Sequence, residues 1–297
     1  GGALVGWDLR RNRINLLNTL ARHPEMYHDA PVAEPEPEAE GGEQKTIHDI
    51  VRTLTPQQKE ALVYDWHDRV SGLDHFYAEL APASAHRLGR VHDEGDFVLG
   101  LYDDRSAEAD NEPASTASSG TLSSPTIVRF RRTGGIFRDG SVATIVLTKT
   151  WSLDPASGGF RLVVELRRID DNLAPLQTWY APEFNFGLFA GDDPTRRTTG
   201  PPPTEDLRPL GEDVGRVGPS LHVQSQPEDL DVRLSISGSA DLRIPWRTFP
   251  IQTVSQSETG FELNFQSVCV LPHIPLTIEP RETVTVELLA EVGPFPN

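Results

Sequence analysis

Apolar and polar residues alternate with a period of two along most of the chain after residue 96. In residues 160–168, Phe160, Leu162, Val164 and Leu166 share one face, whereas Arg161, Glu165 and Arg167 share the other. This is the pattern of a strand with one buried and one solvated face. The same period, with many Val, Ile, Phe and Thr residues, predicts strands at residues 97–102, 126–132, 142–151, 160–168, 178–189, 232–237, 261–271 and 283–292. Residues 96–297 are therefore predicted to form a mainly β, antiparallel sandwich.

The N-terminal part of the chain has mixed periods. Residues 3–10 alternate and predict a half-buried strand. Leucines and an isoleucine at helical spacing, with Pro24 beyond them, predict a short helix over residues 13–23. Residues 45–66 predict a second helical region. The sequence TPQQ at residues 55–58 indicates that a new helix begins there, because it combines a threonine cap, a proline at the first helical position and a glutamine three residues after the cap.

Three stretches lack any apolar period. Residues 31–44 are rich in glutamate, proline and glycine, so they cannot bury enough surface to offset the cost of ordering their backbone. We expect a mobile acidic loop there, in preference to a metal-binding cluster. Residues 103–125 and 193–219 predict long irregular segments, which are usually either functional or disordered. The second could also pack along a face or an edge of a sheet.

The length of the chain indicates the number of domains, and its charge indicates which partners are compatible with it. A chain of 297 residues with 37% apolar content can bury one substantial core, so a single domain over residues 1–297 is predicted. The formal charge of −17 disfavours nucleic acid and anionic membranes as partners but is compatible with a neutral glucan. The single cysteine, Cys269, excludes an intrachain disulfide and fits a reducing, cytoplasmic location. The sequence begins at Gly1 without an initiator methionine, as expected for a piece of a longer protein.

The common sequence signatures of catalysis are absent. The chain has no G-x-S-x-G elbow, phosphate loop, paired-cysteine zinc spacing or H-E-x-x-H. His67 and His75 have no third residue nearby at ligand spacing, so no metal site and no cofactor are predicted. The acidic pairs 170–171 and 192–193 flank predicted strands and are interpreted as turn formers rather than as the carboxylate pair that glycoside cleavage needs. No catalytic residue is predicted.

Four residues are candidates for binding a carbohydrate. Trp179 and Trp246 stand beside polar residues, and an aromatic ring can stack on a sugar, although core packing is the stronger interpretation for both. Glu183 and Asn185 share one face of a predicted strand whose other face carries phenylalanines. Their polar groups could bind sugar hydroxyls or be buried and hydrogen-bonded to neighbouring strands.

Several segments resemble one known family. They are residues 1–28 (GGALVGWDLRRNRINLLNTLARHPEMYH), 64–76 (YDWHDRVSGLDHF), 132–140 (RTGGIFRDG), 147–151 (LTKTW), 179–192 (WYAPEFNFGLFAGD), 249–261 (FPIQTVSQSETGF) and 268–275 (VCVLPHIP). In this order they resemble the C-terminal β-sandwich domain of glycoside hydrolase family 57 α-amylases and 4-α-glucanotransferases. The resemblance implies a large double-sheet supersandwich of the galactose-mutarotase-like kind. It also implies an N-terminal catalytic barrel as partner, which carries the family's catalytic carboxylates, so none is assigned to this chain.

The leading hypothesis is a non-catalytic C-terminal domain that stabilises an α-glucan-processing enzyme and contributes to glucan binding. One alternative is a free-standing carbohydrate-binding module. Another is a mutarotase-like enzyme, for which His222, His273 and Glu183 are the candidate residues, although their spacing does not indicate that they converge.

Overall fold

The computed structural model describes residues 2–32, 53–109, 126–154, 156–171, 174–188, 190–200, 206–237, 243–258 and 260–296. Most of the predicted acidic loop, the first part of the predicted helical region at 45–66 and much of the irregular stretch at 103–125 lie outside these residues. No helix in the described part is both long and apolar enough to cross a membrane.

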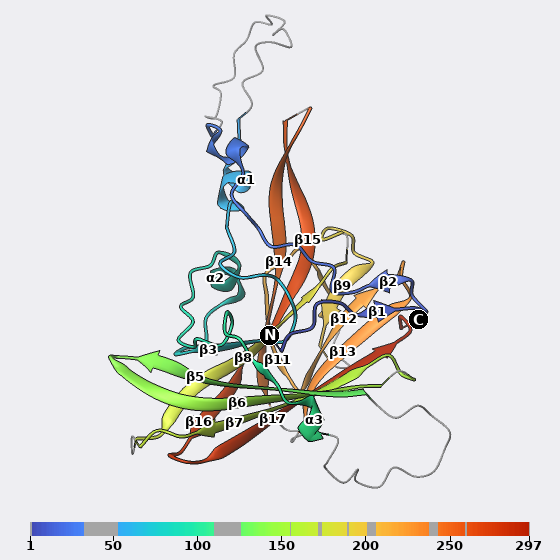
Figure 1. Cartoon of the computed structure of the whole chain (residues 1–297). Coiled ribbons are helices and arrows are strands. Elements are labelled where there is room, and N and C mark those ends of the chain that lie inside the picture. The colour runs from blue at the N-terminus through green and yellow to red at the C-terminus, as the bar shows by residue number, and fades with distance from the viewer. Residues whose placement is uncertain are drawn as a thin grey trace, which may run out of the picture.

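The strands form two large antiparallel sheets and one small hairpin (Figure 1). The nine-stranded sheet has the order β10-β9-β12-β13-β17-β7-β6-β5-β4, and the six-stranded sheet has the order β11-β14-β15-β8-β16, with β3 paired to β8 and β1 paired to β2 in the hairpin. The strands are β1 (Asp8–Leu9), β2 (Ile14–Asn15), β3 (Leu73–Tyr77), β4 (Asp103–Asp104), β5 (Thr126–Arg138), β6 (Ser141–Leu153), β7 (Phe160–Arg168), β8 (Leu176–Phe186), β9 (Arg196–Thr199), β10 (Arg208–Pro209), β11 (Val214–Gly218), β12 (Ser220–Ser225), β13 (Leu230–Ser237), β14 (Ile244–Ser257), β15 (Gly260–Pro272), β16 (Ile274–Ile278) and β17 (Thr283–Gly293).

Helices are short in the described part of the chain. They are the 3-10 helix η1 (Met26–Asp29), α1 (Pro56–Glu60), α2 (Ala83–Arg87) and α3 (Ser106–Ala109). The helix α1 lies beside the long β14–β15 hairpin (Figure 1), and Gln58 donates from Nε2 to the carbonyl of Phe261 at 2.7 Å. The predicted capping box is present, because the Thr55 hydroxyl accepts from the Gln58 amide and the Gln58 side chain accepts from the Thr55 amide.

The main core lies where the inward faces of the two sheets meet. Strand β7 contributes the apolar face expected from its alternation, while Arg161 and Arg167 remain exposed. Strands β8, β14 and β15 contribute large side chains to the same cluster, among them Phe184, Phe186 and Trp246. Burial of these side chains supplies most of the driving force for closing the sandwich. The prediction of a mainly β, double-sheet antiparallel sandwich is thus confirmed.

Two local predictions are wrong, and a third is only partly right. Residues 13–23 form no helix, because Arg13 adopts a left-handed backbone (φ 57°) and the Asn15 side chain accepts from the Trp7 and Leu17 amides in place of helical carbonyls. Residues 97–102 form no strand, because Phe97 turns into the core while the chain bends after it. In residues 53–66, helix is limited to α1.

Other differences concern where strands begin and end. The N-terminal strand is limited to β1, with Leu4 forming a single bridge to Ser71. The stretch 193–219, predicted to be irregular or to pack on a sheet, contains β9, β10 and β11 and so pairs at sheet edges. Strands β3, β12, β14 and β16 were not predicted. Several of them are buried on both faces and therefore lack a clean alternation.

Candidate functional site

A buried lysine and a buried aspartate join the two sheets. Lys149 on β6 places Nζ 2.6 Å from Oδ2 of Asp74 on β3, and each side chain is 1% exposed. Asp74 also accepts from the hydroxyls of Tyr102, at 2.6 Å, and Tyr180, at 2.8 Å. Lys149 donates further to the carbonyls of Gly2 and Gly72. A buried charge is tolerated when it is paired and hydrogen-bonded in this way.

A second buried network is centred on Glu183 of β8. Its carboxylate accepts from Arg69 Nη1 at 3.0 Å and from Asn185 Nδ2 at 2.7 Å, both on Oε1. On Oε2, the nearest atoms are Nε2 of His75 at 3.1 Å and Nε2 of His67 at 3.2 Å. Strand β3 supplies His75, and the segment just before β3 supplies His67 and Arg69. Because β3 pairs with β8, these residues meet although more than 100 positions separate them from Glu183.

Two further carboxylates bind the residues that surround Glu183. Asp93 accepts from Nδ1 of His75 at 2.8 Å. Asp65 binds Arg69 and also Arg22, whose Nη2 lies 2.7 Å from Oδ1. Glu183, Asp93 and Asp65 are therefore connected with Arg69, Arg22 and His75 in one buried cluster.

The cluster shifts the pKa values of its members. Burial alone would raise the pKa of Glu183, but the charge of Arg69 and the hydrogen bonds from both histidines hold it well below the usual range. Burial likewise opposes ionisation of Asp65, yet its bonds from Arg22 and Arg69 lower its pKa to about 2. For His75, burial acts to lower the pKa, and the bonds to Asp93 and Glu183 outweigh it and raise the pKa to about 9. The carboxylates are thus fixed as anions rather than poised to exchange protons near neutral pH.

The cavity beside this cluster is small. It has a volume of about 40 Å³ and is lined by Trp66, His67, His75 and Glu183 among others. Such a volume holds about one water molecule, whereas ligand pockets usually measure about 300–1,000 Å³. A sugar ring does not fit between these side chains as they stand.

The four predicted carbohydrate-binding residues lie in three kinds of surroundings. Glu183 and Asn185 are buried in the ionic cluster just described. Trp246 is 1% exposed in the main core, where its Nε1 donates to the carbonyl of Gly218. Trp179 is half-buried and packs against a smaller apolar cluster, so it keeps some solvent-facing surface.

The other candidates are placed apart from one another. His222 pairs with Asp231 across β12 and β13, and His273 contacts His86, so neither meets Glu183, which is bound by His67 and His75 instead. Asp170 accepts from Arg168 and from the Thr144 amide, and Asp193 accepts from the Thr195 amide and hydroxyl. Asp170 and Asp193 thus hold turns and neighbouring strands.

The buried pair His86 and His273 predicts a loss of stability on the acid side of neutrality. Their Nε2 atoms are 3.2 Å apart, and His273 Nδ1 lies 3.2 Å from the Leu271 carbonyl. With Nδ1–H donating to that carbonyl, His273 accepts at Nε2 from a neutral His86. Burial and the neighbouring His273 lower the pKa of His86 to about 3. Burial, aided by Arg247 and His75, lowers that of His273 to about 4.

Because both folded-state values lie below the ordinary value near 6.5, the unfolded chain binds more protons below that pH. The contribution of this pair to stability should therefore be present above pH 6.5 and fall by about 4–5 kcal/mol between pH 6.5 and 4.5. Urea unfolding at several pH values measures this. The His86→Gln variant should show a clearly shallower fall, and an equal fall in both proteins would contradict the assignment to this pair.

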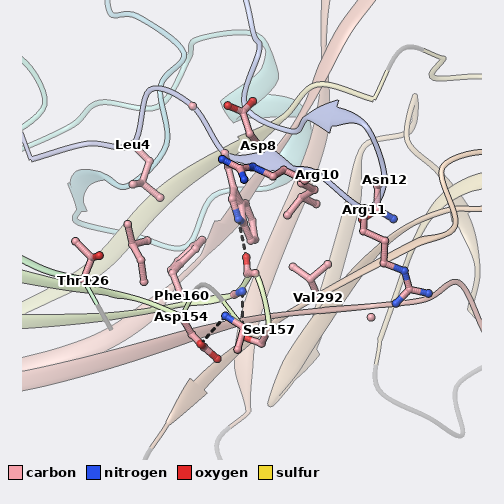
Figure 2. Close-up of a pocket in the computed structure, with 18 residues that line it drawn as sticks. Leu4, Asp8, Arg10, Arg11, Asn12, Thr126, Asp154, Ser157, Phe160 and Val292 are labelled. Carbon is pink, nitrogen blue, oxygen red and sulfur yellow. Dashed lines mark hydrogen bonds between the residues drawn. The ribbon is translucent and has the colours of Figure 1, made fainter. Parts of the chain in front are cut away.

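A wider pocket lies under the N-terminal hairpin. It has a volume of about 680 Å³. Figure 2 shows Asp8 and Arg10 approaching it from one side and Asp154, Ser157 and Phe160 from the other. The Trp7 ring closes part of its floor, held by a 2.8 Å hydrogen bond from Nε1 to the Gly158 carbonyl. Its size lies within the usual range for small-ligand sites, and it combines apolar walls with charged side chains.

Fold and site together define the class of protein: an antiparallel double-sheet β-sandwich in which the carboxylates around Glu183 are buried beside a cavity of about 40 Å³. Residues 1–288 match the family described as "Alpha-amylase/4-alpha-glucanotransferase, C-terminal". The chain therefore belongs to this family of C-terminal domains.

The relatives agree with this assignment. A 4-alpha-glucanotransferase of Thermococcus litoralis is 25% identical over 292 residues, which cover 96% of this chain and 36% of that protein. A 4-alpha-glucanotransferase of Thermococcus kodakarensis is 36% identical over 104 residues, 34% of this chain and 16% of that protein. The crystal structure of the T. litoralis enzyme superposes on 97% of this chain and 34% of its own, with a TM-score of 0.66 and 18% identity, and so has the same fold. The chain spans about a third of the first relative's length.

Sequence reasoning did not find His67, Arg69 and His75 as partners of Glu183. A signal was present, because all three lie in the YDWHDRVSGLDHF segment that carries part of the family resemblance, together with Asp65 and Asp74. The spacing along the chain gave no indication that this segment meets β8. That meeting follows only from the pairing of β3 with β8.

Proposed function

We propose that this chain is the non-catalytic C-terminal domain of an α-glucan-processing enzyme of the glycoside hydrolase family 57 type, in which it stabilises the parent protein and contributes to glucan binding. The observation that carries the proposal is the family match along residues 1–288, combined with a span of about a third of a 4-alpha-glucanotransferase relative. An N-terminal catalytic barrel is the partner in this proposal. A cytoplasmic location belongs to it as well, since the single cysteine cannot form an intrachain disulfide.

The absence of catalysis is supported by the chemistry of the charged clusters. Cleavage of a glycosidic bond needs one protonated and one ionised carboxyl group on either side of the bond. The carboxylates around Glu183 are held as anions by arginine and histidine. They also adjoin a cavity of about 40 Å³, too small for a sugar. The same lack of room weighs against a mutarotase-like activity at Glu183.

The pocket of Figure 2 supports the glucan-binding part of the proposal, because it has space for a short saccharide next to hydrogen-bonding groups. Trp179 is the alternative contact, since its ring is half-buried rather than enclosed. A free-standing carbohydrate-binding module would use the same surfaces.

Activity assays on maltooligosaccharides test the non-catalytic assignment. The chain alone should neither hydrolyse nor transfer, whereas the same chain joined to its catalytic portion should be active. Appreciable turnover by the chain alone would defeat the proposal. Loss of stability in a parent enzyme from which this chain is deleted would support its stabilising role, and unchanged stability would oppose it.

Electrophoresis in gels that contain glycogen tests glucan binding separately. Retardation that is lost in Arg10→Ala places the glucan in the pocket of Figure 2, and retardation lost in Trp179→Ala places it on the β8 face. Val217→Ala, at an exposed apolar residue outside both surfaces, is the control. Unretarded migration of the unmodified chain would remove glucan binding from the proposal.

A further inference from the structure

Two histidine nitrogens converge on one oxygen of Glu183, which makes a group of three possible metal ligands. His67, His75 and Glu183 each offer one ligand atom, a ring nitrogen or a carboxylate oxygen, and these three atoms all lie within 4.8 Å of one another. Nε2 of His67 is 3.2 Å from Oε2, and Nε2 of His75 is 3.1 Å from it. When four ligands surround an ion tetrahedrally at the zinc–nitrogen distance of about 2.0–2.1 Å, neighbouring donors are about 3.3 Å apart. The spacing of these donors therefore suits a small divalent ion.

The surrounding groups orient the three donors toward one point. Arg69 and Asn185 bind the other oxygen of Glu183, Oε1, which leaves Oε2 directed at the histidines. Asp93 accepts from Nδ1 of His75, and this bond keeps a proton on Nδ1, so that Nε2 presents its lone pair to an ion once the proton shared with Glu183 is displaced. At His67, no described group bonds to Nδ1, so a proton can occupy that atom without breaking a bond there.

Charge and space are also favourable. The carboxylates of Glu183, Asp93 and Asp65 balance the guanidinium groups of Arg69 and Arg22 together with the proton that His75 shares with them, so a bound ion would take the place of that proton. The adjoining cavity of about 40 Å³ can hold one water molecule as a fourth ligand. Imidazole nitrogen with carboxylate oxygen is a donor set that zinc and neighbouring transition metals prefer over calcium or magnesium.

We propose that His67, His75 and Glu183 bind one divalent transition-metal ion of the zinc class. The ion would join β8, β3 and the segment before β3, and its role would be to fix these elements rather than to perform catalysis. The sequence predicts no metal site because Glu183 lies 116 residues from His67 and 108 from His75. The fold, through the pairing of β3 with β8, supplies the third donor.

Titration of the chelator-treated chain with Zn²⁺, followed by calorimetry and by metal analysis after dialysis, tests the proposal. We expect about one ion per chain and a rise in melting temperature on addition of Zn²⁺. Titration with Co²⁺ should give the intense visible absorption of a four-coordinate site. These readouts need no glucan, so their failure is distinct from failure of the proposed function.

Matched variants locate the ion. His67→Gln keeps a hydrogen-bond donor beside Glu183, which favours retention of the fold, but lacks the imidazole, so it should lose both the zinc uptake and the rise in melting temperature. Asp93→Asn should weaken zinc affinity about 10–100-fold, as is usual for a group that orients a ligand. His222→Gln changes a histidine paired with Asp231 outside the cluster and should bind zinc normally. Absence of zinc and cobalt binding by the unmodified chain, or unchanged uptake by a folded His67→Gln protein, would overturn the proposal.

Discussion

Replacement of Asp74 by alanine is expected to lower the free energy of unfolding by about 3–5 kcal/mol, the usual cost of breaking a buried ion pair by removing one partner. The Lys149 ammonium, 1% exposed, would keep only carbonyl oxygens as partners. The hydroxyls of Tyr102 and Tyr180 would lose their acceptor as well. Because Lys149 belongs to one sheet and Asp74 is paired to the other, the loss falls on the contact between the sheets. Urea unfolding followed by tryptophan fluorescence measures it.

An exposed ion pair on the same sandwich provides the control for Asp74. Arg161 and Glu287 are 49% and 30% exposed and pair across β7 and β17. Arg161→Ala should cost no more than about 1 kcal/mol, since solvent screens such a pair. If Asp74→Ala cost as little as Arg161→Ala, the buried pair would not be holding the sheets together.

The sheet body could be predicted from the sequence because its signal is local. In β7, alternation alone gives the correct bounds and the correct buried face. For β5, β6, β13, β15 and β17 the same signal finds the strand but shortens or shifts its ends. Strands of a sheet with one wet face encode their orientation in successive residues, so no distant contact is needed to recognise them.

The predictions fail where contacts between residues far apart in the sequence determine the local structure. Residues 13–23 carry a helical spacing of leucines, yet Leu16 and Leu17 are buried against the sandwich with the Leu16 amide bonded to Trp7 and the Leu16 carbonyl bonded to Gly187. Leu20, assigned to the same predicted stripe, is exposed. The apolar residues are thus buried by a neighbouring strand rather than by one face of a helix, and periodicity cannot distinguish the two cases.

At the candidate site, too, the local pattern could be predicted from the sequence and the distant contacts could not. Alternation in β8 places Glu183 and Asn185 on one face and leaves open whether they bind sugar or neighbouring strands. In the structure Arg69, His67 and His75 occupy that face. Their position depends on the register of β3 against β8, in which Leu73 is opposite Glu183 and His75 opposite Ala181. A register shift of one residue would turn His75 away, and nothing in either segment alone specifies that register.

Replacement of Glu183 by leucine is expected to lower the free energy of unfolding by about 3–5 kcal/mol in the presence of a chelator, because it removes the shared anion of a buried cluster. Arg69 would still bind Asp65, and His75 would still bind Asp93. Nη1 of Arg69 and Nε2 of His75, which donate to Glu183, would however lose their acceptor. Glu183→Gln should cost less than leucine, since its amide oxygen still accepts from at least one of the four donors around Glu183. The exposed Glu291, paired with Arg233, supplies the control variant Glu291→Gln, expected to cost no more than about 1 kcal/mol. The free energy of unfolding should therefore fall most in Glu183→Leu, less in Glu183→Gln and least in Glu291→Gln. If Glu183→Leu were as stable as the unmodified chain, the free-energy cost of desolvating the ions at Glu183 would equal the gain from their attraction. This cluster would then not stabilise the sandwich.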